Sequence, residues 1–440
     1  MFNTSFKKKL FLFAAMSSIA VGSWMGTCAF SPSSAEAETN HDNGKVKNVI
    51  FMIPDGFSAA YATHYRWYKG KQSLLDSMFV GMHRTYSASS AVTDSAAAAT
   101  AMATGVKTNN GMISLSPKGK TLKTILEAAE ATGKASGLVA TATITHATPA
   151  AFASHAVSRT SEATIAPQLL NNGVDVILGG GRRYFPDSLL KEAREKGYQL
   201  VSNREQLAAA NKTGKLIGLF AEEGLAAELD RDVTNQPSLA EMSKAAIEVL
   251  HQEKDGFFLL IEGSEIDWAG HVHDAAWAMK DAEAFEAAVE KVLEFAKKDK
   301  HTLVVVAGDH DTGGMSVGGY GKYAANIEVL RNVTATGYFM ARKLNPARSN
   351  IKEVVKHYAN INLTDGEAAK IRAAQKADIA INEVISERAL VGWTTFKHTG
   401  MDVPVYAFGP GSNLFYGLHN NTDLPQLMAQ VMGISFLPAH

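Results

Sequence analysis

The stretch NVIFMIPDG, residues 48–56, decides the expected fold. An apolar run of strand length, Asn48–Ile53, ends abruptly at Pro54-Asp55-Gly56. Similar runs recur at residues 135–140, 174–178, 257–261, 302–307 and 403–408. Near-continuous apolar runs without alternation are typical of strands in a parallel sheet that is buried on both faces.

Helix-like patterns separate these runs, at residues 122–131, 162–172, 187–196, 239–252 and 275–298. The alternation predicts an α/β fold, with a mostly parallel central sheet covered by helices on both faces. In such sheets, ligands bind at the carboxyl ends of the strands. The stretch from about 313 to 395 breaks the rhythm and contains a helix-like segment at 365–388. We expect it to be a smaller, crown-like insertion in a domain spanning residues 47–440.

The N-terminus has the order of a secretory signal peptide. Lys7, Lys8 and Lys9 precede an apolar run from 10 to about 21, and Ala35-Glu36-Ala37 follows. We therefore expect a signal peptide at 1–37, a flexible leader at 38–46, and a secreted protein. It would be extracellular or associated with the cell envelope, in the periplasm if the source has an outer membrane. An uncleaved anchor and a lipoprotein attached through Cys28 are the alternatives, and Thr27 is a poor fit to the second.

The bulk composition excludes some classes of partner. Of 440 residues, 46% are hydrophobic and 20% charged, and the formal net charge of -1 shows no basic excess for nucleic acid or anionic membranes. Cys28 is the only cysteine. The exported chain would therefore have no disulfide, so its core, and bound metal if present, must hold it together.

Acidic residues and histidines follow the predicted strands. Asp55, Glu262 and the pair Asp309-His310 come directly after three of them, and His398 precedes a fourth. Asp267 and His271 are four residues apart, so on a helix they share one face. A lone aspartate at a strand end is usually a cap, and a lone histidine is usually structural. Their coincidence at one edge of the sheet predicts a site for several metal ions.

A second signal is Val92-Thr93-Asp94-Ser95-Ala96-Ala97, followed by small helix formers up to Gly105. It places Ser95 at a helix N-terminus, where free N–H groups and the helix dipole suit an anionic phosphoryl group. A serine hydroxyl becomes a nucleophile only when its alkoxide is stabilised, which a bound cation can do. The alternative is that Asp94 or Ser95 is only an N-cap.

A third signal is the segment 145–159, which ends at Arg159. A guanidinium is a bidentate fork that can bind two phosphoryl oxygens at once. The alternative is an ordinary surface arginine.

Taken in this order, the segments resemble the alkaline phosphatase family, from about residue 48 to 432 and most weakly between 314 and 393. The resemblance implies a metal-dependent enzyme that hydrolyses small-molecule phosphate monoesters. Ser95 would be the nucleophile and become phosphoserine. Arg159 would bind the phosphoryl oxygens, and Asp94 would orient Arg159.

The resemblance also implies two zinc ions and a third metal. It assigns the first zinc to Asp267, His271 and His398, the second to Asp55, Asp309, His310 and the Ser95 oxygen, and the third metal to Asp55, Thr148 and Glu262. The third metal would be Mg²⁺, but His146 stands where the best-known bacterial members have an aspartate. An imidazole ligand favours Zn²⁺ or Co²⁺, and whether His146 ligates directly stays open. Trp268 stands where those members have a lysine.

Two other functions were weighed against this one. A related hydrolase could act on phosphodiesters or sulfate esters, but Arg159 suits a group with more charged oxygens than a diester has, and Ser95 lacks the sulfatase motif. A catalytically silent binding protein would be expected to lack the nucleophile or a ligand, and none is missing. No nucleic acid partner and no stable membrane anchor are expected. Many relatives are dimers, so a homodimer stays open.

Overall fold

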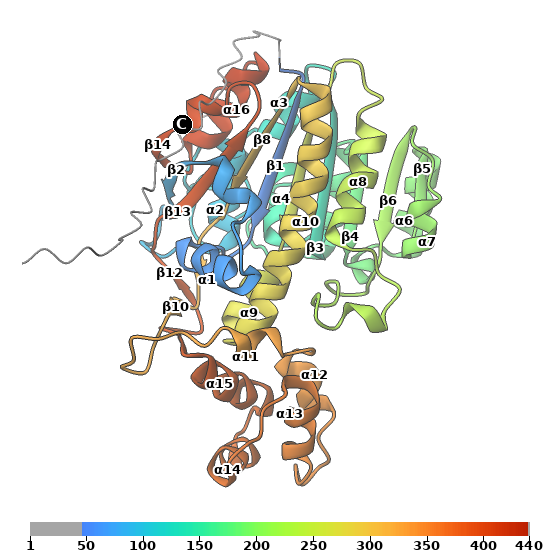
Figure 1. The fold of residues 1–440 in the computed structure, drawn as a ribbon. Coiled ribbons are helices and arrows are strands. Elements are labelled where there is room, and N and C mark those ends of the chain that lie inside the picture. The colour runs from blue at the N-terminus through green and yellow to red at the C-terminus, as the bar shows by residue number, and fades with distance from the viewer. Residues whose placement is uncertain (1–45, 439–440) are drawn as a thin grey trace, which may run out of the picture. The chain divides into compact units, whose positions relative to one another are not determined.

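The computed structural model describes residues 46–438, which contain a ten-stranded sheet (Figure 1). The strand order is β14-β2-β13-β8-β1-β7-β3-β4-β6-β5. The strands are β1 (Asn48–Pro54), β2 (Phe79–Arg84), β3 (Ala135–Thr143), β4 (Val176–Gly180), β5 (Tyr198–Val201), β6 (Lys215–Leu219), β7 (Phe257–Gly263), β8 (Thr302–Ala307), β13 (Val403–Phe408) and β14 (Gly417–Asn420).

Within this sheet only β13 runs antiparallel to its neighbours, β8 and β2. The predicted α/β class with a mostly parallel sheet is therefore confirmed. The predicted signal peptide and all but the last residue of the predicted leader lie outside the described residues. No helix between residues 46 and 438 combines the length and apolarity needed to span a bilayer.

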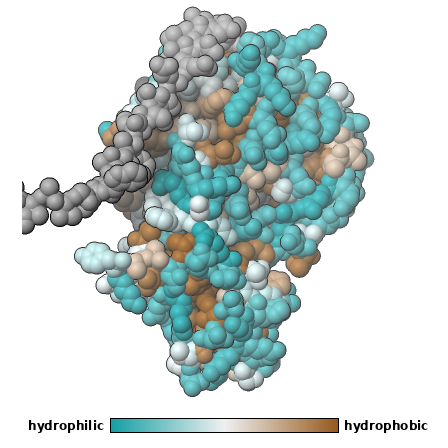
Figure 2. Space-filling view, viewed as in Figure 1, coloured by the Kyte–Doolittle hydropathy of each residue, from teal (hydrophilic) through white to brown (hydrophobic). Residues whose placement is uncertain are grey.

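Helices cover both faces of the sheet, and β1 shows why the sequence demands it. Val49, Phe51 and Ile53 point to one core, whereas Ile50 and Met52 point to the other, and all are fully buried. Burying a side chain of this size stabilises the fold by roughly 1.5–3 kcal/mol. The first core is closed by α2 (Ser95–Thr104), α3 (Ile125–Glu130), α4 (Ala147–Ala153), α5 (Glu162–Asn171), α6 (Asp187–Glu195) and α16 (Asp423–Met432). The second is closed by α1 (Ala59–Lys69), α7 (Arg204–Ala208), α8 (Leu239–Leu250), α9 (Glu265–His271) and α10 (Ala275–Asp299). The face shown in Figure 2 is mainly hydrophilic, as this interior packing requires.

Four strands were not anticipated: β2, β5, β6 and β14. β5 has only four residues, β2 and β14 have exposed residues, and β6 begins at Lys215 and is interrupted by Gly218, so none shows the long apolar run that marks a doubly buried strand. β14 also depends on a tertiary contact. A Cβ on Gly81 would lie 2.0 Å from the carbonyl oxygen of Gly417, so glycine is needed for the edge strand to pair with β2.

The segment predicted as an insertion is mostly helical. It comprises α11 (Glu328–Arg331), α12 (Gly337–Arg342), α13 (Ile351–Ala359), α14 (Asp365–Ala373), α15 (Ala377–Ala389) and the paired short strands β10 (Ser316–Val317) and β11 (Val391–Gly392). These helices form the orange group at the bottom of Figure 1. The helix-like segment 365–388 is two helices, because the backbone turns to an extended conformation at Ala374. Arg348 Nη1 donates to the carbonyls of Ile371 and Ala374 at this break.

The two ends of the segment 313–395 lie side by side. β9 (Asp311–Thr312) pairs antiparallel with β12 (His398–Thr399). Gly313 N donates to the Lys397 carbonyl directly beside this pair, at 2.9 Å. The pairing brings residue 398 back to the end of β8, where residues 309 and 310 lie.

Candidate active site

The site lies where the carboxyl ends of four neighbouring strands meet. The order β8-β1-β7-β3 is contiguous, and β1, β7, β8 and β3 are mutually parallel where they pair. Asp309 and His310 follow β8, Asp55 follows β1, and Glu262 ends β7. This is the edge at which α/β sheets bind ligands.

The first cluster consists of Asp267, His271 and His398. Asp267 and His271 lie one turn apart on α9, with Oδ2 and Nε2 separated by 3.4 Å. His398 Nε2 lies 3.4 Å from Asp267 Oδ1 and 3.1 Å from His271 Nε2. Burial raises the pKa of Asp267, but the hydrogen bond from His398 and the charges of His271 and His310 outweigh it, so the pKa lies below its usual value.

Backbone carbonyls orient both imidazoles of the first cluster. His271 Nδ1 donates to the Phe396 carbonyl at 2.8 Å, and His398 Nδ1 donates to the Thr93 carbonyl at 2.9 Å. These bonds fix a proton on each Nδ1, and both Nε2 atoms point toward Asp267 and toward each other. Such an arrangement is typical of metal-ligating histidines.

The second cluster consists of Asp55, Asp309 and His310, all buried. His310 Nε2 lies 3.1 Å from Ser95 Oγ, 3.1 Å from Asp309 Oδ2 and 3.5 Å from Asp55 Oδ1. Asp309 Oδ2 and Asp55 Oδ1 have no hydrogen-bond partner among residues 46–438. Burial, followed by the charge of Asp309, raises the pKa of Asp55 well above its ordinary value.

The third cluster consists of Asp55, His146 and Glu262. Both carboxylate oxygens of Glu262 and Nδ1 of His146 are buried without a hydrogen-bond partner. Burial and the nearby Asp309 raise the pKa of Glu262 to about 8. Thr148 Oγ1 lies 3.4 Å from Asp55 Oδ2, beside this cluster.

These orphaned oxygens fit bound cations. A buried carboxylate without a partner costs several kcal/mol, and a cation restores that loss. The first and second clusters combine imidazole and carboxylate, a donor set that suits Zn²⁺. The second and third share Asp55, as a bridging carboxylate would require.

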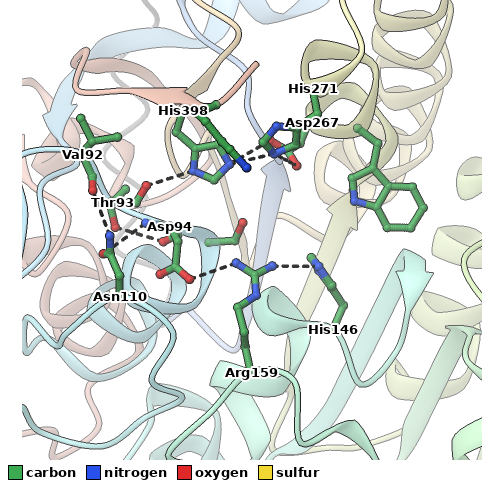
Figure 3. Close-up of a pocket in the computed structure, with 12 residues that line it drawn as sticks. Val92, Thr93, Asp94, Asn110, His146, Arg159, Asp267, His271 and His398 are labelled. Carbon is green, nitrogen blue, oxygen red and sulfur yellow. Dashed lines mark hydrogen bonds and ion pairs between the residues drawn. The ribbon is translucent and has the colours of Figure 1, made fainter. Parts of the chain in front are cut away.

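Arg159 lies across the pocket from His398 and Asp267 (Figure 3), and Ser95 lines the same pocket. Ser95 is the first residue of α2, and Asp94 is its N-cap, with Oδ1 accepting from Ala97 N at 3.0 Å. The other Asp94 oxygen accepts from Gly111 N at 3.0 Å and from Arg159 Nη1 at 3.1 Å. Asp94 therefore caps α2 with one oxygen and pairs with Arg159 through the other.

Arg159 also donates a hydrogen bond to His146, which fixes the position of the proton on a ring of the third cluster. Arg159 Nη2 donates to His146 Nε2 at 2.9 Å. Burial, followed by the charge of Arg159, lowers the pKa of His146 to about 3, so the ring is neutral. A neutral imidazole carries one proton, and here it must sit on Nδ1. The same ring cannot accept this bond and ligate a cation through Nδ1 at once.

The chain is similar in sequence to known alkaline phosphatases. The alkaline phosphatase family model matches residues 46–434. Alkaline phosphatase 4 of Bacillus subtilis is 40% identical over 451 residues, covering 97% of each chain.

The chain belongs to the alkaline phosphatase family.

Solved structures agree. A cold-active alkaline phosphatase from Shewanella sp. superposes with a TM-score of 0.84 at 36% identity, covering 88% of this chain and 99% of that one. A mutant of the TAB5 alkaline phosphatase, solved with Mg bound in its M3 site, has a TM-score of 0.67 at 27% identity and covers 89% of this chain and 99% of its own. The predicted enzyme class is confirmed: alkaline phosphatases are metal-dependent hydrolases of phosphate monoesters, and this one contains clusters that could hold metals.

The pocket of this alkaline phosphatase has a volume of about 430 Å³. Its polar lining includes Ser95, Arg159, His146, Asp267, His271 and His398. Trp268 stands edge-on to His146, with ring centroids 6.1 Å apart at 87°. Trp268 fits there because Gly224 has no side chain: a Cβ would lie 2.6 Å from the indole.

Sequence reasoning missed several residues of the site. Asn110 Nδ2 donates to the Val92 carbonyl, and its Oδ1 accepts from Asp94 N, so it braces the start of α2. Thr312 Oγ1 donates to Asp267, and Lys397 lines the pocket beside His398. Lys397 and Thr312 adjoin motif residues, a signal that could have found them. Asn110 has no such signal.

Proposed function

We propose that this chain hydrolyses phosphate monoesters through a phosphoserine formed on Ser95. The observation that carries the proposal is the position of Ser95 Oγ. It lies at the N-terminus of α2, 3.1 Å from His310 Nε2 of the second cluster, in the pocket that Arg159 also lines.

The phosphoryl group is held by groups of the chain itself. Arg159 offers a fork to two phosphoryl oxygens, and Asp94 holds the guanidinium at the pocket wall. The N-terminus of α2 adds its dipole to the same end of the pocket. These groups favour the charge that spreads over the phosphoryl oxygens in the transition state.

The reaction then has two displacements. Ser95 Oγ forms a bond to phosphorus as the ester P–O bond breaks, and the alcohol leaves with a proton. Water then attacks phosphorus and gives a proton to the Ser95 oxygen as the Ser95 O–P bond breaks, and inorganic phosphate leaves. Two Zn²⁺ ions, held by the first and second clusters, would supply Lewis acidity to the serine and leaving-group oxygens.

The third cluster would hold a further metal, with Asp55, Thr148 and Glu262 as its oxygen ligands. An oxygen-only set suits Mg²⁺, which the TAB5 mutant structure contains at its M3 site. Here the Arg159 bond to His146 Nε2 favours that set, because it puts the proton on Nδ1. Release of this bond would let His146 ligate and shift the preference toward Zn²⁺ or Co²⁺.

The decisive experiment is a phosphoenzyme trap combined with chelation. Incubation with a labelled aryl monoester followed by acid quench should label Ser95 in the wild type. Ser95→Ala should lose the label and several orders of magnitude of kcat, with a residual rate from the remaining groups. Exhaustive chelation should abolish the activity, and zinc should restore it. An unlabelled enzyme, or one equally active without metal, would contradict the proposal.

We also propose that residues 47–440 are the exported catalytic domain, carrying the 313–395 segment as an insertion. The support is the lysine cluster, the apolar run and Ala35-Glu36-Ala37. N-terminal sequencing of secreted protein should begin at Glu38. Material that begins at Met1 would contradict the predicted cleavage.

A further inference from the structure

Three residues that follow α9, Val272–Asp274, tie the first cluster to the insertion. The Val272 carbonyl accepts from Asn382 Nδ2 at 3.0 Å, and the His273 carbonyl accepts from Ser386 Oγ at 3.2 Å. Asp274 Oδ2 accepts from Gly337 N at 2.9 Å. Each of these residues thus contacts α12 or α15, immediately after the cluster residue His271.

The side chain of His273 is held between two aromatic rings. Its ring stacks on Phe396 with centroids 3.8 Å apart at 9°, and on Trp393 at 4.8 Å and 5°. Its Nε2 donates to the Thr395 carbonyl at 2.8 Å. Trp393 is fixed in turn, because its Nε1 donates to Ser386 Oγ at 3.0 Å. His273 therefore fastens the returning segment 393–396 from both ring faces and one edge.

This segment orients the imidazole of His271 and leads along the chain directly to His398. The Phe396 carbonyl accepts the Nδ1 proton of His271 at 2.8 Å. His398 follows Phe396 by two residues. Between them lies Lys397, whose carbonyl accepts a hydrogen bond from Gly313 N. A shift of Phe396 would turn His271 and displace His398 together.

We propose that His273 is a positioning residue for the first metal cluster, acting as an aromatic clamp through which the insertion holds His271 and His398 in place. The proposal rests on the proposed function, which assigns a zinc ion to this cluster. It goes beyond that function by giving the insertion a task at the metal site. Groups that orient metal-ligating histidines typically change metal affinity 10- to 100-fold when they are removed.

The test measures zinc bound per chain at graded, buffered free zinc, in the full-length mature protein. His273→Asn removes the ring but keeps a residue that tolerates the local φ of 54°. Phe396→Leu removes the outer, half-exposed ring and leaves the backbone carbonyl in place. His251→Asn is the matched control, since it also removes a histidine ring from an aromatic pair, with Phe295 at 5.0 Å. His398→Ala and His310→Ala identify the binding steps of the first and second clusters.

We expect His273→Asn to weaken the first-cluster step about tenfold and to leave the second-cluster step unchanged. Phe396→Leu should weaken the same step about two- to tenfold, and carries the test alone if His273→Asn does not fold. His251→Asn should change neither step. An equal loss at both steps would mean a general structural role and would overturn the clamp, as would no change at either step. If His398→Ala itself removed no zinc, the metal assignment of the first cluster would fail, and the clamp with it.

Discussion

At the scale of single residues, the carboxylate of Asp94 makes two kinds of contact at once. One of its oxygens caps α2, and the other holds Arg159 and Gly111 N. Because α2 begins at Ser95, the same residue sets the position of the serine and of the guanidinium. Functional geometry here is built from an ordinary helix cap.

Arg159 allows a test of the monoester preference at the same scale. A charge-assisted hydrogen bond contributes roughly 1.5–3 kcal/mol, so Arg159→Ala should lower kcat/KM for an aryl monoester about ten- to several-hundredfold. A diester has one charged oxygen fewer, so its kcat/KM should fall less. The ratio of kcat/KM for the monoester to that for the diester should therefore decrease. Inhibition by inorganic phosphate should weaken in parallel.

Arg66→Ala is a suitable control for this variant. Arg66 is another arginine with an aspartate partner, Asp76, but it lies on α1 and is 43% exposed. Arg66→Ala should leave kcat/KM unchanged for both the monoester and the diester. A ratio that stays the same in Arg159→Ala would show that the guanidinium does not bind the phosphoryl group.

At the scale of elements, the capping box of α3 supports the loop that leads to Arg159. Thr124 and Glu127 cap the helix reciprocally, and Glu127 Oε1 also binds His155 Nε2 at 2.9 Å. His155 Nδ1 donates to the Ser114 carbonyl at 3.0 Å. Both ring nitrogens therefore face acceptors, which favours the doubly protonated ring.

This pair predicts a pH-dependent stability. Burial lowers the pKa of His155, but the bonds to Glu127 and Ser114 outweigh it and raise the pKa above 6.5. The protonated His155 ring therefore stabilises the fold. This stabilisation is fully present below pH 6.5 and is lost as the pH rises through the folded-state pKa of His155. Glu127 has a lowered pKa, because the His155 and Thr124 bonds outweigh burial, so its share is lost only as the pH falls below about 4.5.

We therefore expect His155→Gln to destabilise the fold more at pH 5.5 than at pH 9, with a difference of roughly 1 kcal/mol. Thermal or denaturant unfolding at the two pH values measures it. His357→Gln, an exposed histidine on α13, should show no such difference. Equal losses for His155→Gln at both pH values would mean that the pair does not titrate as described.

At the scale of the whole molecule, the sheet gathers buried carboxylates at one edge. Asp55, Glu262 and Asp309 are fully buried there, and each has an oxygen without a hydrogen-bond partner. A core built in this way is destabilised by its own active site unless cations bind. The rest of the sheet and its two hydrophobic layers must offset that cost.

Metal removal should therefore lower the melting temperature as well as the activity. A ligand at 100 times its Kd stabilises a fold by about 2.7 kcal/mol, and several bound ions add to this. Asp309→Asn should respond less to chelation, since it removes one of the repelling carboxylates and one ligand together. Identical melting curves with and without chelator in the wild type would contradict this account.

The sequence by itself determined the central strands of the sheet and which acidic side chains follow them. Apolar runs of strand length that alternate with helical patterns indicate doubly buried strands, and Asp55, Glu262 and Asp309 lie where these runs end, so parallel packing brings them to one edge. The cap at Asp94 was equally local. These features depend on neighbours in the chain, which is why pattern and spacing suffice to find them.

Only the tertiary structure decided how the imidazoles are aimed and held. His398 is oriented by Thr93, 305 residues away in the chain, and His271 by Phe396, 125 residues away. The bond from Arg159 to His146, the brace at Asn110 and the stack around His273 are likewise contacts between separate elements. The hydrophobic periodicity of the sequence does not predict such contacts. They form only when the sheet has assembled and β12 has paired with β9.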